Sequence, residues 1–149
     1  MVTQREWDRR NMAVAREAMS WSKDPSTKVG AVIVDTLNRP ISWGYNGYPR
    51  GVHDRRLDDR DFKYLSTLHA EMNAILNSRN LSDLQGATLY CTSLHPCSMC
   101  AATIIQTGIK RVVYMTDKHS ERWTASVERA RDMFHEAGVV SVLFSERNL

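Results

Sequence analysis

The sequence predicts an α/β fold of three layers, in which helices cover both faces of a central mixed sheet of about five strands. Two β-rich runs joined by a short connection follow an amphipathic first segment, and they predict neighbouring strands. Helical and strand-like segments then alternate to the end of the chain, as in sheets covered by helices. With 149 residues, 42 % hydrophobic and 25 % charged, the chain has the size and composition of a single globular domain, 1–149.

The first half of the chain contains the amphipathic segment and the two β-rich runs. Apolar residues recur at helical spacing until Pro25, which cannot continue a helix. After the runs VGAVIVD and PISWGYN, the chain turns polar and charged for about twenty residues, and loops of that length in compact domains are often functional. The expected elements are a helix over 3–21, strands over 29–35 and 40–46, and an excursion over 47–66 that is either a long loop or a loop with a short helix.

The second half alternates between helix and strand. Pro96 is favoured in a first helical turn, and Gly138 is expected to end the last helix. The expected elements are a helix over 66–77, a strand over 87–92, a helix opening at Pro96, a strand over 111–116, a helix over about 120–137 and a strand over 139–144.

The bulk composition limits location and partners. No apolar run approaches the ~20 residues of a membrane span, and the N-terminus lacks the charged-then-apolar order of a signal peptide. We therefore expect a cytoplasmic protein without a membrane partner. The net charge of +3 is mild, but basic residues concentrate in the excursion and favour an anionic ligand. They are Arg50, Arg55, Arg56, Arg60 and Lys63.

Two cysteines at the start of a predicted helix have the spacing of metal ligands. In HPCSMCAATII, Cys97 and Cys100 are separated by three positions and therefore share one helix face. The positive end of the helix dipole lowers thiol pKa and favours the thiolate that binds metal. Two buried cysteines without metal are the alternative for this pair alone. Cys91, the third cysteine, is interpreted as a buried apolar residue.

A histidine and a glutamate interrupt a run that otherwise fits a buried helix face. In LHAEMNAIL, His69 and Glu71 are two residues apart and would point in different directions in mid-helix. At a helix tip both side chains could project past the end toward one point. We therefore expect Ser66 or Thr67 to cap this helix.

Together these two helix starts predict one catalytic zinc per subunit. His69, Cys97 and Cys100 would supply three ligands and leave a fourth tetrahedral position for water. Zinc acidifies such a water, and Glu71, held beside the metal without binding it, could carry the proton to a substrate. H-A-E followed by P-C-x-x-C is the signature of zinc-dependent nucleobase deaminases.

Four stretches extend this similarity over most of residues 22–102. SKDPSTKVGAVIVD, GYNGYPRG, HAEMNAIL and LYCTSLHPCSMCA resemble the deoxycytidylate deaminase branch of the cytidine and deoxycytidylate deaminase superfamily. The resemblance implies that activated water attacks the amino-bearing carbon of the cytosine of dCMP. Glu71 would protonate first the ring nitrogen and then the departing amine. The products would be ammonia and dUMP, which supplies thymidylate synthesis.

The resemblance also implies substrate and effector contacts. Asn46 would contact the sugar hydroxyl, and the Ala70 backbone amide would contact the pyrimidine carbonyl. Lys28, Arg50 and the other basic residues of the excursion could bind the phosphate, and glycines at 44 and 47 permit positive φ and close approach to a ligand. Members of the branch form hexamers activated by dCTP and inhibited by dTTP. The candidate effector residues are Gly44, Tyr45, Asn46, Gly47 and Arg50.

Two other functions stay open at this point. One is a deaminase of another free base or of a polynucleotide, which would bind nucleic acid along the basic excursion. The mild net charge and the GYNG turn argue against a nucleic-acid partner. A noncatalytic zinc module would need Cys91 or His95 as a fourth ligand. We instead expect His95 to line the pocket or support a ligand.

Several other residues are expected to be core or surface residues without a catalytic role. The tryptophans at 7, 21, 43 and 123 are interpreted as core, although Trp43, Tyr45 and Tyr48 could flank a nucleotide or a subunit contact. Charges along the last helix, Arg122 included, are interpreted as a solvated face. The remaining histidines are expected at or near the surface: His53, His119 and His135.

Overall fold

The computed structural model describes residues 1–145 and contains one five-stranded sheet with helices against it. The strands are β1 (Gly30–Val34), β2 (Pro40–Tyr45), β3 (Thr88–Cys91), β4 (Arg111–Tyr114) and β5 (Val140–Leu143). The α-helices are α1 (Gln4–Met19), α2 (Arg60–Ser66), α3 (Ala70–Leu76), α4 (Ser98–Gln106) and α5 (Thr124–Ala137), and short 3₁₀ turns are η1 (Asp54–Arg56), η2 (Leu81–Leu84) and η3 (Glu121–Trp123).

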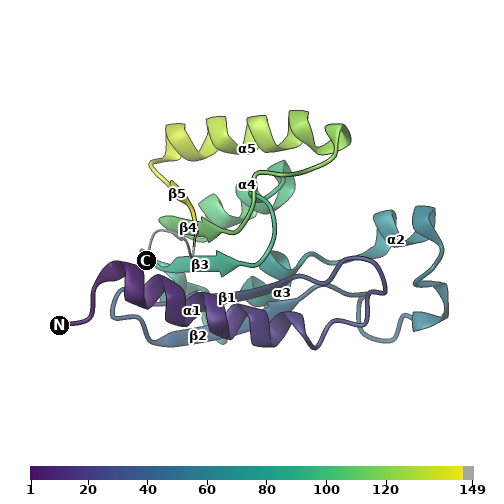
Figure 1. The fold of residues 1–149 in the computed structure, drawn as a ribbon, viewed down its shortest axis with the longest axis horizontal. Coiled ribbons are helices and arrows are strands. Elements are labelled where there is room, and N and C mark those ends of the chain that lie inside the picture. Colours follow the sequence, from purple (N-terminus) through teal and green to yellow (C-terminus); the bar gives the residue numbers. More distant parts are fainter. Residues whose placement is uncertain (146–149) are drawn as a thin grey trace.

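The sheet has the strand order β2-β1-β3-β4-β5 and is mixed. β1 pairs antiparallel with both β2 and β3, whereas β3, β4 and β5 run parallel. Helices lie on both faces of the sheet, and α2 projects beyond one end of it (Figure 1). The predicted three-layer α/β/α fold with a mixed sheet of five strands is confirmed.

One face of the sheet packs on α1. This helix starts with a capping box between Thr3 and Glu6, and its buried side includes Met12 and Ala15. These two residues form a core cluster with alternate residues of the strands, among them Val32. Because side chains alternate along a strand, the residues between them point to the opposite face.

The other face packs on α3, α4 and α5. The core cluster there combines Ala31 and Ile33 of β1 with Ala74, Ile104 and Phe134 of the three helices. Strand residues are thus buried on both sides, which explains why GAVIV is apolar throughout rather than alternating.

Gly44 lets the edge strand β2 approach α3 closely. A Cβ at this position would collide with the backbone of Ala70 and Ala74. Neither Gly44 nor Gly47 has a positive φ, so the expected use of positive φ at these two glycines is wrong. Gly44 does permit a close approach of the backbone, as expected, but the neighbour is helix α3 rather than a ligand.

The helix expected over 66–77 starts later, at Ala70, and α2 is a separate short helix within the excursion before it, with a break between the two. α2 ends at Ser66, Thr67 is its extended C-cap, and His69 itself is the N-cap of α3. The prediction that Ser66 or Thr67 caps the second helix is therefore wrong. The break arises because Leu68 forms an antiparallel bridge with Gly47, in which the Leu68 N–H donates to the Gly47 carbonyl at 2.8 Å.

Two further helix starts differ from expectation. Pro96 lies outside α4, because Cys97 is the N-cap. The last helix begins at Thr124 after η3, and Gly138 ends it in the left-handed conformation with φ of 75°. Gly138 is the expected terminator, since glycine adopts this conformation without steric cost.

The tryptophans are less buried than expected. Trp21 and Trp43 are 50 % and 43 % exposed, so their interpretation as core residues is wrong. Trp21 contacts Tyr45 edge-to-face at a centroid distance of 6.2 Å. Trp123 packs partly buried against the core.

A buried ion pair joins α1 to β3 and β4. Asp8 accepts hydrogen bonds from both Arg111 Nη atoms, at 2.7 and 2.8 Å, and from the Tyr90 hydroxyl at 2.6 Å. Burial alone would raise the pKa of Asp8, but the bonds from Arg111 and Tyr90 outweigh it and hold the pKa below its ordinary value of 3.8. Burial and the bond to Asp8 raise the pKa of Tyr90 to about 12.

Asp8→Asn is expected to lower the free energy of unfolding at pH 7 by about 3 kcal/mol, because it leaves the Arg111 guanidinium partly buried without a counter-charge. The native pKa of Asp8 is depressed, so its ionic contribution is present above pH 3.8 and is lost as pH falls through the native pKa. The difference between wild type and variant should therefore shrink in acid. Urea unfolding at pH 7 and pH 3 measures it, with Asp132→Asn on the exposed side of α5 as control. An unchanged difference at pH 3 would contradict this role.

Within residues 1–145, no helix is both long enough and apolar enough to cross a bilayer.

Candidate active site

One end of the sheet carries a cavity of about 830 Å³. β2 and β3 finish at this end and β1 begins there, because Gly30 is paired with Tyr45 and Ala31 with Cys91. The segments that follow or precede these strand ends supply the cavity lining, together with α2, α3 and η3. The volume is within the usual range for small-molecule sites. All three predicted metal ligands are grouped beside this cavity, and His69 and Cys97 line it.

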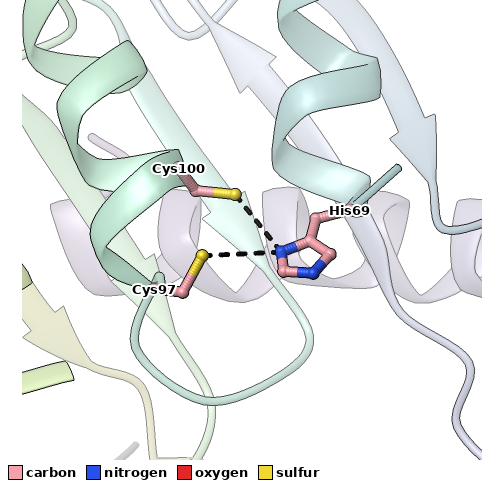
Figure 2. Close-up of side chains that lie close together, drawn as sticks. All are labelled: His69, Cys97 and Cys100. Carbon is pink, nitrogen blue, oxygen red and sulfur yellow. Dashed lines mark hydrogen bonds between the residues drawn. The ribbon is translucent and has the colours of Figure 1, made fainter. Parts of the chain in front are cut away.

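His69, Cys97 and Cys100 converge on one point (Figure 2). The Nδ1 atom of His69 lies 3.6 Å from Cys97 Sγ and 3.4 Å from Cys100 Sγ. A tetrahedral zinc bound by one imidazole and two thiolates would hold nitrogen and sulfur about 3.5 Å apart. Both the donor types and their spacing fit one zinc ion, so this group is positioned to bind one metal ion.

The helix starts explain this convergence. His69 is the N-cap of α3, while Cys97 is the N-cap of α4 and Cys100 lies three residues further on. Neither N-cap side chain is used to cap its own helix, which leaves both free to face a ligand. The expected one-face arrangement of the two cysteines is present although Pro96 does not start the helix.

The three side chains share protons. The hydrogen bond with Cys97 raises the pKa of His69 to about 9. The bonds from Cys100 and His69 lower the pKa of Cys97 to about 4, and the same contact with Cys97, with burial, raises the pKa of Cys100. Near neutral pH the group therefore contains an imidazolium, a thiolate and a thiol.

Zinc binding at pH 7.5 is expected to release about two protons, one from His69 and one from Cys100, because zinc takes neutral imidazole and thiolate ligands. Affinity should accordingly weaken as pH falls. Isothermal titration calorimetry in two buffers of different ionisation enthalpy counts the protons. Release of none would show that zinc binds elsewhere or through other atoms.

Glu71 lies in the first turn of α3, buried beside the group. It is 4 % exposed and lines the cavity. Burial raises the pKa of its carboxyl, which the nearby His69 partly counteracts. Its carboxylate is outside the set of donor atoms that lie within 4.8 Å of one another, so it is placed beside the metal position rather than in it.

Two other residues that could close the metal site do not join it. Among the described residues, neither Cys91 nor His95 belongs to the convergent donor group. Cys91 is fully buried, as expected, and its Sγ lies 3.9 Å from the Leu94 carbonyl. His95 lines the cavity, with Nδ1 3.0 Å from the Pro96 carbonyl and its ring against Tyr114. The geometry favours three protein ligands and an open position.

Asn46 and Ala70, the expected sugar and base contacts, both line the cavity. The Asn46 side chain bridges to the backbone before β1: its Oδ1 accepts from Val29 N–H at 2.9 Å, and its Nδ2 donates to the Thr27 carbonyl at 2.8 Å. As the first residue of α3, Ala70 has a backbone N–H with no partner within the helix. The sequence reasoning did not foresee that Asn46 also orders the cavity wall.

Most of the other substrate and effector candidates lie away from the lining. Lys28 and Arg50 are exposed, and Gly44 packs against the backbone of α3. Tyr45 is 41 % exposed at the end of the edge strand, and Gly47 pairs with Leu68. The structure thus does not bring these residues together around the metal position.

Sequence reasoning named Lys63 among the basic residues of the excursion but missed its partners in the cavity wall, and it missed Arg122 as a lining residue. Lys63 donates to Asp24 at 3.0 Å and to the Ser26 hydroxyl at 2.8 Å, and this ion pair is largely buried. Arg122 is exposed, as expected, but it lies in η3 rather than on the last helix, and it lines the cavity mouth. Its position in a 3₁₀ turn ahead of α5 was hidden by the charge periodicity of the helix itself.

Comparisons with known proteins agree with this site. Residues 5–116 match the model of the cytidine and deoxycytidylate deaminase zinc-binding region. Deoxycytidylate deaminase of Mus musculus is 44 % identical over 151 aligned positions, which cover 95 % of this chain and 82 % of the mouse protein. The human deoxycytidylate deaminase is 43 % identical over 141 positions, covering 90 % of this chain and 77 % of the human one.

A solved structure shares the whole architecture. The dCMP deaminase of cyanophage S-TIM5, crystallised with dCMP and dUMP, superposes with a TM-score of 0.75 at 28 % identity. The match covers 95 % of this chain and 98 % of the phage protein. Since the family model covers most of the chain and includes all three convergent ligands, the protein belongs to the cytidine and deoxycytidylate deaminase family.

Proposed function

We propose that this protein hydrolyses dCMP to dUMP and ammonia, with one zinc per subunit, and so supplies dUMP for thymidylate synthesis. The observation that carries the proposal is the His69–Cys97–Cys100 group beside a buried Glu71 at one wall of the cavity. The choice of dCMP is supported by the mouse and human relatives and by the phage enzyme, which was crystallised with dCMP and dUMP.

The side chains divide the chemistry between them. His69, Cys97 and Cys100 would hold zinc, which supplies a Lewis acid that lowers the pKa of water at the open position. Glu71 would accept a proton from the attacking water and pass it to the ring nitrogen of cytosine. It would then take the second proton of that water and deliver it to the departing amine, so that water and dCMP become dUMP and ammonia.

The environment of Glu71 suits this transfer. Burial raises the pKa of this carboxyl, so it holds a proton more readily than an exposed glutamate would. Its place outside the ligand group keeps the proton available to a substrate.

The same walls would orient the nucleotide. The Ala70 N–H, at the positive end of α3, is available to the pyrimidine carbonyl. Asn46, fixed by Thr27 and Val29, would contact the sugar hydroxyl. We keep Lys28 as a substrate candidate of lower rank, because it is exposed and lies outside the lining.

Ammonia release from zinc-loaded protein tests the substrate. dCMP, CMP, deoxycytidine and a cytosine-containing oligonucleotide are offered in parallel. We expect turnover to be much the highest with dCMP. Turnover of the oligonucleotide with none of dCMP would instead identify a polynucleotide deaminase, and turnover of neither, with zinc bound, would overturn the proposed reaction.

Assembly and regulation follow from the resemblance alone. We propose a homohexamer activated by dCTP and inhibited by dTTP, with Gly44, Tyr45, Asn46, Gly47 and Arg50 as effector candidates in or next to the basic excursion. Sedimentation with each triphosphate, and activity titrations, would check both properties. Indifference of activity to both nucleotides would remove the regulatory part. A cytoplasmic location stays a prediction that cell fractionation would test.

A further inference from the structure

We propose that Arg122 binds the 5′-phosphate of the substrate and thereby makes the enzyme select a nucleotide over a nucleoside. This inference rests on the proposed deamination of dCMP and names the residue that sets its substrate class. It is carried by the charges at the cavity mouth and by the contacts that hold Arg122 there.

Three lysine or arginine side chains line the cavity, and one of them already has a partner. Lys63 is bonded to Asp24 and to the Ser26 hydroxyl and has little exposed surface. Asp24 is also held by the backbone N–H groups of Ser26 and Thr27. This pair is therefore part of the wall, and its charge is compensated.

Arg122 and Arg60 are the lining cations whose charge is not compensated. Within residues 1–145, neither makes an ion pair with a carboxylate. Arg60 starts α2 directly after Asp59, the N-cap, and is followed by Asp61. Arg60 thus has an acidic residue on each side, whereas Arg122 has one, Glu121, on its N-terminal side only. The local positive potential is lowered more at Arg60, which leaves Arg122 as the stronger anion site.

Aromatic rings hold the guanidinium of Arg122 in place. Its Cζ lies 3.8 Å from the centre of the Tyr64 ring and 5.0 Å from the centre of the Trp123 ring. Contacts of this kind fix the plane of the guanidinium but leave its N–H groups free to donate. A planar fork with free donors matches two oxygens of a phosphate.

Trp123 relates this cation to the metal position. Its ring meets the ring of His69 edge-to-face at 6.2 Å. Adjacent residues of η3 thus contact the metal ligand on one side and present a cation at the mouth on the other. A nucleotide with its base at the metal position would extend its phosphate toward this mouth.

The test compares dCMP with deoxycytidine in wild type, Arg122→Gln and Arg122→Lys. Loss of one charged hydrogen-bonding group should lower kcat/KM for dCMP by about 10- to 100-fold in Arg122→Gln, mostly through KM, and Arg122→Lys should be intermediate. kcat/KM for deoxycytidine should change by less than about threefold, because no phosphate is present. Arg129→Gln, on the exposed side of α5, is the matched control.

Binding of the product gives a second readout that needs no turnover. Arg122→Gln should weaken binding of dUMP by a similar factor and leave the binding of deoxyuridine unchanged. Equal losses for nucleotide and nucleoside would mean that Arg122 only shapes the cavity. A larger selective loss in Arg60→Gln than in Arg122→Gln would assign the phosphate to Arg60 and overturn the proposal.

The aromatic support can be tested separately. Tyr64→Phe keeps the ring and should retain the preference for dCMP, whereas Tyr64→Ala should reduce it in the same direction as Arg122→Gln. If wild type fails to deaminate dCMP, the proposed function fails. If wild type deaminates dCMP and Arg122→Gln does so equally well, only the role of Arg122 fails.

Discussion

Glu71→Gln is expected to lower kcat for dCMP by about 10³- to 10⁴-fold, because proton transfer by a positioned side chain contributes on that order and this carboxyl serves two transfers. Glutamine preserves the size of the buried side chain but cannot carry a proton. Zinc should stay bound at one ion per chain, since the carboxylate lies outside the group of ligand atoms.

Metal analysis and ammonia release on the same preparation check both parts of this prediction. Glu128→Gln, on the exposed surface of α5, is the control and should keep full activity. Activity above a tenth of wild type in Glu71→Gln would remove Glu71 as the proton carrier. Loss of zinc would instead show that its carboxylate binds the metal.

Cys100→Ala is expected to abolish both zinc binding and turnover. Removal of one of three protein ligands leaves too few donors for a stable site with an open position. Cys91→Ala is a closely matched control, because both cysteines are buried in the same core cluster and lose the same atom. It should retain zinc and activity, at the cost of a small loss in stability from the cavity it creates.

Zinc content of the two purified variants, with circular dichroism to confirm folding, separates the possible outcomes. Full zinc occupancy in Cys100→Ala would place the metal elsewhere. Loss of zinc in Cys91→Ala, with a folded chain, would favour the closed noncatalytic module in which Cys91 is the fourth ligand.

The sequence predicted the layers of the fold because burial leaves a strong pattern. Two neighbouring strands followed by alternating helical and strand-like segments indicated one sheet with helices on both faces, and the structure buries strands such as GAVIV on both sides. Element boundaries near the site were harder to predict. Ser66, Thr67 and Leu68 read as the start of a helix, but the bridge between Leu68 and Gly47 holds the chain extended. That bridge joins residues far apart in sequence and has no local signal.

The metal group was predictable because zinc demands particular donor atoms at particular spacings. Two short motifs, 26 residues apart from His69 to His95, brought all three ligands and Glu71 to attention. The mouth of the cavity was not predictable in the same way. Arg122 became part of it only through η3, and the contact of Lys63 with Asp24, thirty-nine positions away, left no signal in the sequence. Polar residues at a cavity mouth are not separated by a fixed number of positions in sequence, as the zinc ligands are.

The exposed aromatic residues illustrate a second limit. Trp21 and Trp43 fit helix and strand periodicity, but the edge strand β2 has no neighbour on its outer side within residues 1–145. Periodicity predicts which side of an element is apolar, and it does not tell whether another element covers that side.

The most direct test of the active site is a crystal structure of zinc-loaded Glu71→Gln with dCMP. Zinc should be held by His69, Cys97 and Cys100, with the amino-bearing carbon of cytosine at its open side and residue 71 next to the ring nitrogen. Density for dCMP outside the cavity, or a fourth protein ligand on zinc, would contradict the assignment of this cavity as the site of deamination.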